Sequence, residues 1–419
     1  MVRIYIKTFG CSANQSDSEI MEGILVDSGT EIVHCIENAD MVVVNTCTVK
    51  SATEVGVIRY LKRLPKIPVV VTGCLAQARP ELFTDYTVLG TYHIHRIKDA
   101  VLSALANKPE KYLNMEHDEQ MMKRKKLELP YVRKNKVIEI LPISVGCLGE
   151  CSYCHTKFAK GRLVSFREYD VVNRAKKAIA EGAKEIWLTS QDTAAYGIDT
   201  GTNLVSLLEK LVKIDGDFHI RLGMANPEHI MPLKKRLSYI LKNDKMFKFL
   251  HIPVQSGNDR ILGLMERKYT TKDFIETISY FRREIPKITI STDIICGFPG
   301  ETDKEFLDTL KLVEEVKPGV LNISRYSQRP GTKSAALKPQ AGSVIKSRSR
   351  AATKLFSKIS LQENRKWIGW HGWVLVDEYH KSFVGRNYAY KQVVLSEAHT
   401  LGTKVNVKVK SVTSYDLRA

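Results

Sequence analysis

The sequence predicts an α/β protein made of an N-terminal parallel α/β domain, a central partial (β/α)6 barrel and a small C-terminal antiparallel β-barrel. Through most of the chain, nearly continuous apolar strands alternate with amphipathic helices, which is typical of parallel sheets covered on both faces. The last fifty or so residues instead contain short strands of alternating polarity, separated by turns. A chain of 419 residues is long enough for several such domains, each with its own core.

Residues 1–110 are predicted to form a parallel sheet flanked by helices. The run Met41-Val-Val-Val44 is apolar at every position, so a strand here needs cover on both faces. The hydrophobic periodicity places strands at 2–8, 40–45 and 68–72, and helices at 16–28 and 51–64.

A cysteine follows each of these three strands, namely Cys11, Cys47 and Cys74. The carboxyl ends of parallel strands share one edge of a sheet, so we expect the three thiols to converge there. Thiolates favour iron–sulfur clusters or zinc, and three of them can hold a [4Fe–4S] cluster with one iron free. Cys35 precedes a strand instead, and is predicted to pack as a small side chain.

A second group of thiols lies in the motif Cys147-x3-Cys151-x2-Cys154, directly after an apolar strand at 137–145. Thiolates at this spacing can ligate three irons of a [4Fe–4S] cluster, again with one iron open. Tyr153 places an aromatic ring beside the cluster. The alternative is a zinc knuckle, which normally needs a further Cys or His pair nearby, and none follows here.

Residues 111–135 lack periodicity and are predicted to be a linker, with a basic run at 123–126 that could touch a polyanion. Strands and helices then alternate through a central domain at 136–365, whose roughly six βα units indicate a partial barrel. The carboxyl ends of barrel strands form the site, and polar residues follow several of them. They include Gln191, Arg221, Gln255 and the segment Gly297-Phe-Pro-Gly-Glu301.

Residues 366–419 form the predicted C-terminal domain, with strands at 373–377, 383–386, 392–395 and 404–409. In the last strand the valines alternate with Lys404, Asn406 and Lys408, so the valines are expected to face inward. Aromatic residues among the positive charges either stack on RNA bases or fill the core of a small barrel. These are Trp367, Trp370, Trp373, Tyr388 and Tyr390.

Charge is unevenly distributed along the chain, which has a net charge of +18. Residues 1–110 carry 11 basic and 12 acidic side chains, whereas residues 333–419 carry 16 and 5. Such a basic C-terminal part favours a polyanion, most simply nucleic acid, over a solvated basic face. No apolar run reaches the length of a membrane span, and the eight cysteines with no secretion signal indicate a cytoplasmic metal or redox protein.

Three N-terminal blocks resemble the signatures of the radical S-adenosylmethionine (SAM) methylthiotransferases: residues 8–19, 39–49 and 71–77. The central cysteine motif is similar to that of radical SAM enzymes in general. The resemblance implies that Cys147, Cys151 and Cys154 hold the cluster that cleaves SAM, with Gln191, Arg221, Gln255 and Tyr153 as SAM contacts. It further implies that Cys11, Cys47 and Cys74 hold an auxiliary [4Fe–4S] cluster, whose open iron delivers sulfur or methylsulfide.

The residues after the central motif resemble the archaeal and eukaryotic branch that acts on N6-threonylcarbamoyladenosine at position 37 of tRNA. The similarity lies in Thr156, Lys157, Ala159, Gly161, Leu163 and Ser165. It implies that a 5′-deoxyadenosyl radical removes hydrogen from C2 of the adenine, and that a second SAM supplies the methyl group. It also implies tRNA, SAM and a low-potential electron donor such as ferredoxin or flavodoxin as partners, and a C-terminal domain similar to the RNA-binding TRAM module.

Two other functions remain open at this point. Methylthiolation of another tRNA adenosine or of a ribosomal-protein side chain fits the same motifs and the same basic charge. A non-catalytic RNA-binding iron–sulfur protein is also compatible with the cysteines. The glycine-rich segments at the strand ends argue against this last function, because glycine there lets the backbone approach a ligand closely.

Overall fold

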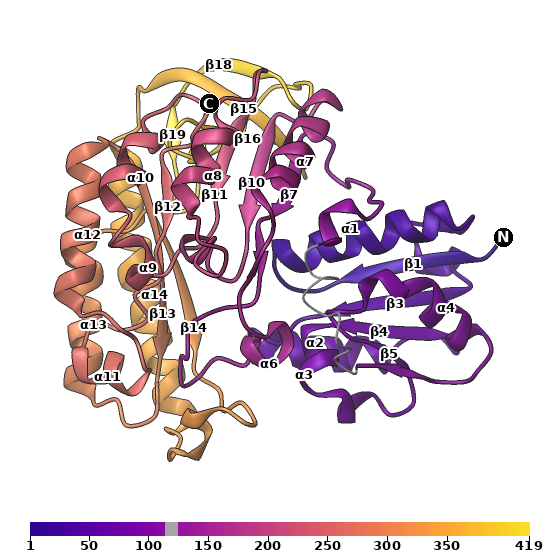
Figure 1. The fold of residues 1–419 in the computed structure, drawn as a ribbon. Coiled ribbons are helices and arrows are strands. Elements are labelled where there is room, and N and C mark those ends of the chain that lie inside the picture. The colour runs from indigo at the N-terminus through magenta and orange to yellow at the C-terminus, as the bar shows by residue number, and fades with distance from the viewer. Residues whose placement is uncertain (114–124) are drawn as a thin grey trace.

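The computed structural model of the chain describes residues 1–113 and 125–419. Residues 114–124 of the predicted linker therefore lie outside the described residues, and they include Lys123 and Arg124 of the basic run. The N-terminal part lies beside the central barrel, and the C-terminal sheet lies across one end of that barrel (Figure 1). The predicted fold class is confirmed.

The N-terminal part is a six-stranded sheet in the order β2-β1-β3-β4-β5-β6, and every pair in it is parallel. Its strands are β1 (Arg3–Thr8), β2 (Glu31–Val33), β3 (Met41–Thr46), β4 (Val69–Gly73), β5 (Thr87–Leu89) and β6 (Lys111–Tyr112). Its helices are α1 (Ser12–Asp27), α2 (Ser51–Leu61), α3 (Cys74–Ala78) and α4 (Ile97–Leu105).

The central strand β3 explains the apolar run seen in the sequence. Met41 and Val43 pack with residues of α1 and α4, whereas Val42 and Val44 pack with residues of α2 and α3. All four side chains are fully buried. Burial on both faces requires an apolar residue at every position, because successive side chains of a strand point to opposite faces.

The central part contains six parallel strands in two ladders, β7-β10-β11 and β12-β13-β14. Single parallel bridges, Ile220 to Met246 and Met224 to His251, connect the ladders, which completes the predicted partial barrel. The strands are β7 (Ile138–Pro142), β10 (Glu185–Thr189), β11 (His219–Leu222), β12 (Phe249–His251), β13 (Thr289–Cys296) and β14 (Val320–Arg325).

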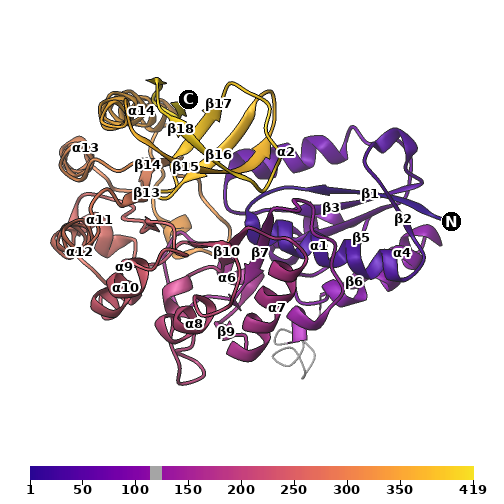
Figure 2. The ribbon, with the colours of Figure 1, turned by 90° about the horizontal axis from the view of Figure 1, so that it is seen from above.

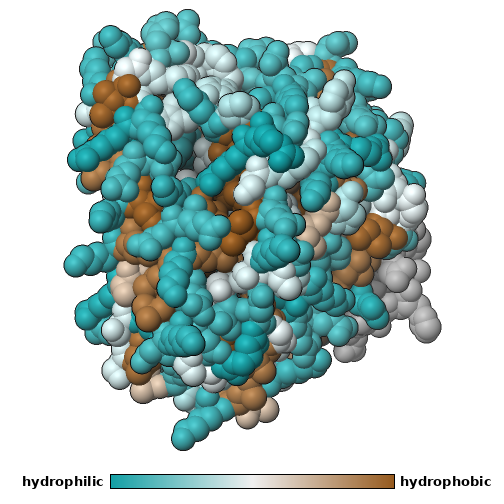
Figure 3. Space-filling view, turned by 90° about the vertical axis from the view of Figure 1, so that its left-hand side faces the viewer, coloured by the Kyte–Doolittle hydropathy of each residue, from teal (hydrophilic) through white to brown (hydrophobic). Residues whose placement is uncertain are grey.

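Helices line the outside of the barrel, several of them at the left of Figure 1, and hydrophilic side chains dominate the face that Figure 3 shows. These helices are α7 (Glu168–Ala180), α8 (Leu204–Leu211), α9 (Pro227–Ile230), α10 (Lys234–Leu241), α11 (Asp259–Leu264), α12 (Thr271–Glu284) and α13 (Asp303–Val316). Within the described residues, no helix is both long and apolar enough to cross a bilayer.

The C-terminal sheet is curled, in the order β18-β15-β16-β17-β20-β19. It differs from the predicted antiparallel barrel at one pair, because β17 and the short final strand β20 run parallel. Its strands are β15 (His371–Tyr379), β16 (Phe383–Asn387), β17 (Gln392–Leu395), β18 (Lys404–Lys408), β19 (Ser411–Val412) and β20 (Leu417–Arg418).

The aromatic residues of the C-terminal domain belong to packed interfaces. Trp367, Trp370 and Tyr388 contact one another in its small core. Trp373 and Tyr390 instead pack against the barrel, where the Trp373 ring stacks on His219 at a centroid distance of 4.6 Å. The core alternative is therefore the correct one for these side chains, and they do not form an exposed stacking surface.

One long helix, α14 (Gly342–Arg365), has no counterpart in the predicted elements. It lies between the barrel and the C-terminal sheet (Figure 2). Ile345 packs on Gly297 at the end of β13, and Ser360 and Asn364 donate hydrogen bonds to the carbonyls of Ser414 and Thr413. The helix thus connects the carboxyl edge of the barrel to the C-terminal domain.

Candidate metal centres

The three N-terminal cysteines lie at the carboxyl edge of the parallel sheet, as the strand positions predict. Cys11 is the N-cap of α1, Cys47 follows β3, and Cys74 is the first residue of α3, directly after β4. Cys11 is exposed, whereas Cys47 and Cys74 are buried. Cys35, by contrast, is exposed and follows the short strand β2, so the prediction that it packs in the interior is wrong.

Asn14 fastens the three cysteine loops to one another. Its amide nitrogen donates to the carbonyls of Phe9 at 2.9 Å and Thr46 at 2.7 Å, and its side-chain oxygen lies 3.5 Å from the Cys74 sulfur. Gly10 has a φ of +109°, and a Cβ there would lie 2.7 Å from the Cβ of Cys47. Only glycine lets these two loops approach so closely.

A buried cluster of charges lies beside this site. Asp17 of α1 pairs with Lys126 and, at 2.8 Å, with Lys160 of the helix α6 (Thr156–Lys160). All three side chains are less than a tenth exposed. Burial alone would raise the pKa of Asp17, but the two ammonium groups outweigh it and hold the pKa below its usual value. Burial also lowers the pKa of Lys126, whereas Asp17 outweighs burial at Lys160 and raises its pKa, so Lys160 is the charged partner of Asp17.

The Lys160 ammonium of this cluster acts on the sulfur of Cys74. Burial raises the pKa of the Cys74 thiol to about 12, and the Lys160 ammonium is the strongest charge that acts against this rise. A thiolate or an anionic metal group at Cys74 would neutralise the buried cation, which is otherwise unfavourable in the interior.

The central cysteines lie in the loop that follows β7 and the short strand β8 (Ser144–Val145), which pairs antiparallel with β9 (Val164–Ser165). Gly146 begins the loop with a φ of +84°, and a Cβ there would lie 1.9 Å from the carbonyl of Arg162. A Cβ on Gly149 would lie 3.3 Å from the sulfur of Cys147 and 3.7 Å from that of Cys151. The loop thus wraps two thiols around one glycine.

Arg267 is the cation of this second site, and no motif in the sequence indicated its role. Its guanidinium donates to the Cys151 sulfur at 3.0 Å and to the side-chain oxygen of Asn226 at 2.6 Å. Asn226 in turn donates to the fully buried Asp192 at 2.8 Å, which also lies 2.6 Å from His229 Nδ1. Polar groups from three separate segments of the barrel thereby hold one thiol.

A hydrogen-bonded seam joins the two cysteine sites. The Thr48 hydroxyl, next to Cys47, donates to Glu54 and lies 2.7 Å from Nδ1 of His155, next to Cys154. A hydroxyl has one proton, so the His155 nitrogen is the donor in the second bond. Arg329 pairs with the same carboxylate of Glu54 and is 6% exposed. The seam places residues adjacent to one ligand of each triad in direct contact.

The donor set of both sites fits iron–sulfur clusters. Each site has three thiols, and backbone amides donate to the sulfurs of Cys147, from Gly149 at 3.2 Å, and of Cys47, from Val49 at 3.4 Å. Among residues 1–113 and 125–419, no group of three His, Cys, Asp or Glu side chains is arranged around a single metal ion. A [4Fe–4S] cluster does not need that arrangement, since each thiolate ligates a different iron.

Known protein families match both regions. Residues 141–313 match the radical SAM superfamily, and residues 3–89 match the Uncharacterized protein family UPF0004. A Pyrococcus horikoshii protein named "Probable threonylcarbamoyladenosine tRNA methylthiotransferase" is 40% identical over 99% of this chain and 98% of its own length. The human threonylcarbamoyladenosine tRNA methylthiotransferase is 39% identical over 94% of this chain and 69% of its own.

The chain belongs to the threonylcarbamoyladenosine tRNA methylthiotransferase family. Among solved structures, the radical SAM methyltransferase TsrM from Kitasatospora setae aligns over 80% of this chain and 77% of its own, with a TM-score of 0.58 and 16% identity. At that identity the likeness shows a shared fold.

Two of the predicted SAM contacts, Gln191 and Tyr153, lie at the central loop of this family member, and a third, Gln255, follows a barrel strand. The Gln191 side chain accepts a hydrogen bond from the Gly146 amide at 2.7 Å, directly before Cys147. Gln255 follows β12 with a φ of +72°, a strained conformation for a residue other than glycine. Tyr153 lies within the cysteine motif, with its ring edge-on to Phe298 at 6.4 Å.

Arg221 lies in a different environment from the other three. Its guanidinium is surrounded by the rings of Trp187, Phe249 and Tyr390, at 5.2 to 5.6 Å from their centroids. Tyr390 belongs to the C-terminal domain. These neighbours suit a cation that helps attach the C-terminal domain to the barrel. A SAM contact at Arg221 stays a prediction.

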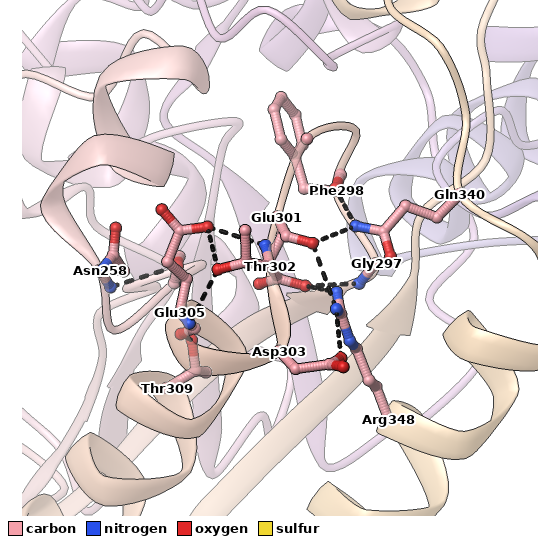
Figure 4. A network of polar contacts seen from close by, with 12 residues as sticks. Asn258, Gly297, Phe298, Glu301, Thr302, Asp303, Glu305, Thr309, Gln340 and Arg348 are labelled. Atoms are coloured by element: carbon pink, nitrogen blue, oxygen red, sulfur yellow. Dashed lines mark hydrogen bonds and ion pairs between the residues drawn. The ribbon is translucent and has the colours of Figure 1, made fainter.

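The glycine-rich segment after β13 is held by a buried polar network (Figure 4). The Glu301 carboxylate accepts from the Gly297 amide at 3.1 Å and from Arg348 of α14 at 2.7 Å. Gln340 donates to the carbonyls of Phe298 and Glu301, at 2.7 and 2.8 Å. The segment that carries Phe298, and with it the ring of Tyr153, is thus fixed from α14.

Proposed function

We propose that this chain converts N6-threonylcarbamoyladenosine at position 37 of tRNA to its 2-methylthio derivative by radical SAM chemistry. The observation that carries the proposal is the identity of about 40% over 99% of the chain with a relative of that printed name. The two thiol sites, joined by the Thr48–His155 contact, are the arrangement that such a reaction needs.

In this proposal Cys147, Cys151 and Cys154 hold a [4Fe–4S] cluster, and Gln191, Arg221, Gln255 and Tyr153 contact SAM. When bound, the cluster and SAM supply the radical that removes hydrogen from an unactivated carbon of the base. Arg267 holds the Cys151 sulfur in place, and the network around Glu301 holds the glycine-rich segment in place.

Cys11, Cys47 and Cys74 are proposed to hold the second cluster, through which sulfur reaches the substrate. The buried Lys160 balances the negative charge that such a group brings. The Thr48–His155 bond and the Glu54–Arg329 pair fix the distance between the two sites. The substrate base can then meet both sites without a rearrangement of the two domains.

The proposed partners are tRNA, SAM and a low-potential electron donor such as ferredoxin or flavodoxin, in the cytoplasm. The cytoplasm keeps thiols reduced, which is consistent with six cysteines that bind metal and do not form disulfides. We keep the predicted division of the chain into a methylthiotransferase domain at 1–110, a linker at 111–135, a radical SAM domain at 136–365 and a TRAM-like domain at 366–419.

Anaerobic reconstitution with iron, sulfide, SAM and dithionite tests the proposal. The enzyme is offered tRNA that carries threonylcarbamoyladenosine, the same tRNA without it, and tRNA with isopentenyladenosine. Mass spectrometry of the nucleosides should show a methylthio product only with the first substrate. A preference for the isopentenyl form contradicts the proposed substrate, and failure to form any 5′-deoxyadenosine from SAM contradicts radical SAM catalysis altogether.

A further inference from the structure

Four exposed basic residues form a continuous ridge along α14. Lys346, Arg350, Lys354 and Lys358 recur at every fourth position, so they lie on one face of the helix. From the first to the last the ridge is about 18 Å long, at 1.5 Å per residue. We call these four residues the α14 ridge.

The α14 ridge has no acidic partners among the described residues: none of its four side chains takes part in an ion pair there. Like charges at this spacing on a helix repel one another. A helix that served only as structure would gain stability if acidic residues were interspersed. The pattern is therefore unfavourable for the free protein and favourable for a bound polyanion.

Most positive charges of the C-terminal domain, unlike those of the α14 ridge, already have a partner in the fold. Of its eight basic residues, five already have partners in the fold. Lys404 pairs with Asp217, and Arg386 pairs with the buried Asp377 at 3.1 Å. Lys366, Arg418 and Lys391 bind Glu363, Asp416 and Asn364, respectively. The basic side chains of residues 333–419 that remain free to bind an anion therefore lie mainly on α14.

A groove of about 630 Å³ runs beside the ridge. Arg350, Lys354 and Lys358 line it together with hydroxyl side chains of the same helix. Arg325, the last residue of β14, lines the groove at the barrel. Tyr415 of the C-terminal domain, which is 79% exposed, also lines it. Cations, hydroxyl donors and an exposed ring are the groups that bind a nucleic acid backbone and its bases.

The groove begins at the edge where the candidate centres lie. Arg325 ends a barrel strand at its carboxyl side, the side that carries the cysteine loop and the glycine-rich segment. Arg348, two positions after the ridge residue Lys346, binds Glu301 of that segment. A strand of nucleic acid lying in the groove therefore approaches the site from the direction of the C-terminal domain.

We infer that the α14 ridge and its groove are the main docking surface for the sugar–phosphate backbone of the tRNA. This inference rests on the proposed function for the identity of the nucleic acid. A ridge of this length spans the phosphates of about five nucleotides on one strand. The TRAM-like sheet then positions α14 and contributes little of the ionic affinity.

The test compares two fourfold variants with equal changes in charge. The ridge variant carries Lys346→Gln, Arg350→Gln, Lys354→Gln and Lys358→Gln. The control carries Gln at Lys98, Lys176, Lys213 and Lys235, which are exposed on other helices or loops. Affinity for unmodified tRNA is measured against salt concentration by fluorescence anisotropy, and circular dichroism checks that both variants fold.

The ridge variant is expected to bind tRNA at least about tenfold more weakly near 0.15 M salt, with a log–log salt slope about 3 units smaller than that of the parent. The control should change the slope by less than about 1 unit. Formation of 5′-deoxyadenosine without tRNA should be unchanged in both. Equal slope losses in the two variants, or an unchanged slope in the ridge variant, would overturn the inference.

The result is separable from the fate of the proposed function. Binding to unmodified tRNA does not depend on which base is modified, because phosphate contacts carry no sequence information. If the parent methylthiolates threonylcarbamoyladenosine but the ridge variant binds normally, only the docking surface is wrong. If the parent binds tRNA through the ridge but forms no methylthio product, only the reaction is wrong.

Discussion

The two cysteine triads achieve a similar arrangement by opposite means. Cys11, Cys47 and Cys74 come from three strand ends separated by up to 63 positions, and the parallel sheet brings them together. Cys147, Cys151 and Cys154 lie within eight consecutive residues of one loop. The first site is therefore a property of a folded domain, whereas the second is a local chain segment that needs outside support.

Each triad has a buried or half-buried cation, but the cations are held differently. Lys160 reaches the N-terminal site from the central domain and shares Asp17 with Lys126. Arg267 comes from the same barrel as its triad and contacts the Cys151 sulfur directly. The comparison indicates that the N-terminal site depends on contacts between domains, and the central site on contacts within one.

The largest expected effect is loss of one function without the other. Replacing Cys147, Cys151 and Cys154 with Ala should abolish SAM cleavage, while Cys11, Cys47 and Cys74 to Ala should spare it and abolish methylthio transfer. Iron and sulfide analysis should find about one cluster per chain in each variant, by ligand count. The exposed Cys35→Ser is the control and should retain both activities. Full transfer by the N-terminal variant would remove the distinction between the sites.

The dependence on contacts between domains can be tested at Asp17. Asp17→Asn leaves two buried ammonium groups without a counter-charge, so the free energy of unfolding should fall by about 3–5 kcal/mol. Asp40→Asn removes an exposed pair with Arg3, which solvent screens, so it should change the free energy of unfolding far less. Denaturant unfolding of the metal-free protein measures both. Equal changes would show that burial of the Asp17 pair is unimportant.

Arg267 tests the support within the central domain. Arg267→Met removes the hydrogen bonds to Cys151 and Asn226, so stability should fall by about 2 kcal/mol, the usual size for bonds of a charged group. Iron uptake by the central triad should also slow, while the N-terminal triad of a Cys147→Ala, Cys151→Ala, Cys154→Ala background should load normally. Slower loading at both triads would indicate a general folding defect.

The smallest expected effect depends on pH and concerns Glu19, on the same helix as Asp17. Burial raises the pKa of Glu19 to about 7. The backbone amide of Lys134 donates a hydrogen bond to the Glu19 carboxylate at 3.2 Å. The folded carboxyl keeps its proton above the unfolded pKa, so stability falls as pH rises from about 4.5 to 7. Relative to Glu19→Gln, the parent should lose about 1 kcal/mol between pH 5.5 and 6.5. A difference that does not vary with pH would contradict the raised pKa.

The fold could be predicted largely because its signals are local. The apolar run of β3 requires a sheet with two covered faces, and the strand-end cysteines follow from that topology. The helix α14 was missed because its buried face is short and interrupted by polar residues such as Arg348 and Ser349, which are buried only through Glu301 and the barrel. The β17–β20 pair was missed because β20 has two residues.

The cysteines proposed as ligands were visible in the sequence, but their supporting residues were not. Asn14, Arg267 and Asn226 act through contacts to residues far along the chain, up to 116 positions for Arg267 and Cys151. No spacing rule reports such a partner. The surroundings of Arg221 were equally invisible, since a polar residue on a barrel strand can face an aromatic ring of another domain.

The pair between Asp17 and Lys160 has a consequence for the order in which the protein is made. The two residues are 143 positions apart, and Asp17 leaves the ribosome first. Domains of a growing chain fold as they emerge, from the N-terminus onward. Until Lys126 and Lys160 have emerged, Asp17 has neither of its counter-charges and must stay hydrated, so α1 cannot settle into its final buried position. The N-terminal metal site is therefore completed only after the central cysteine motif has been synthesised.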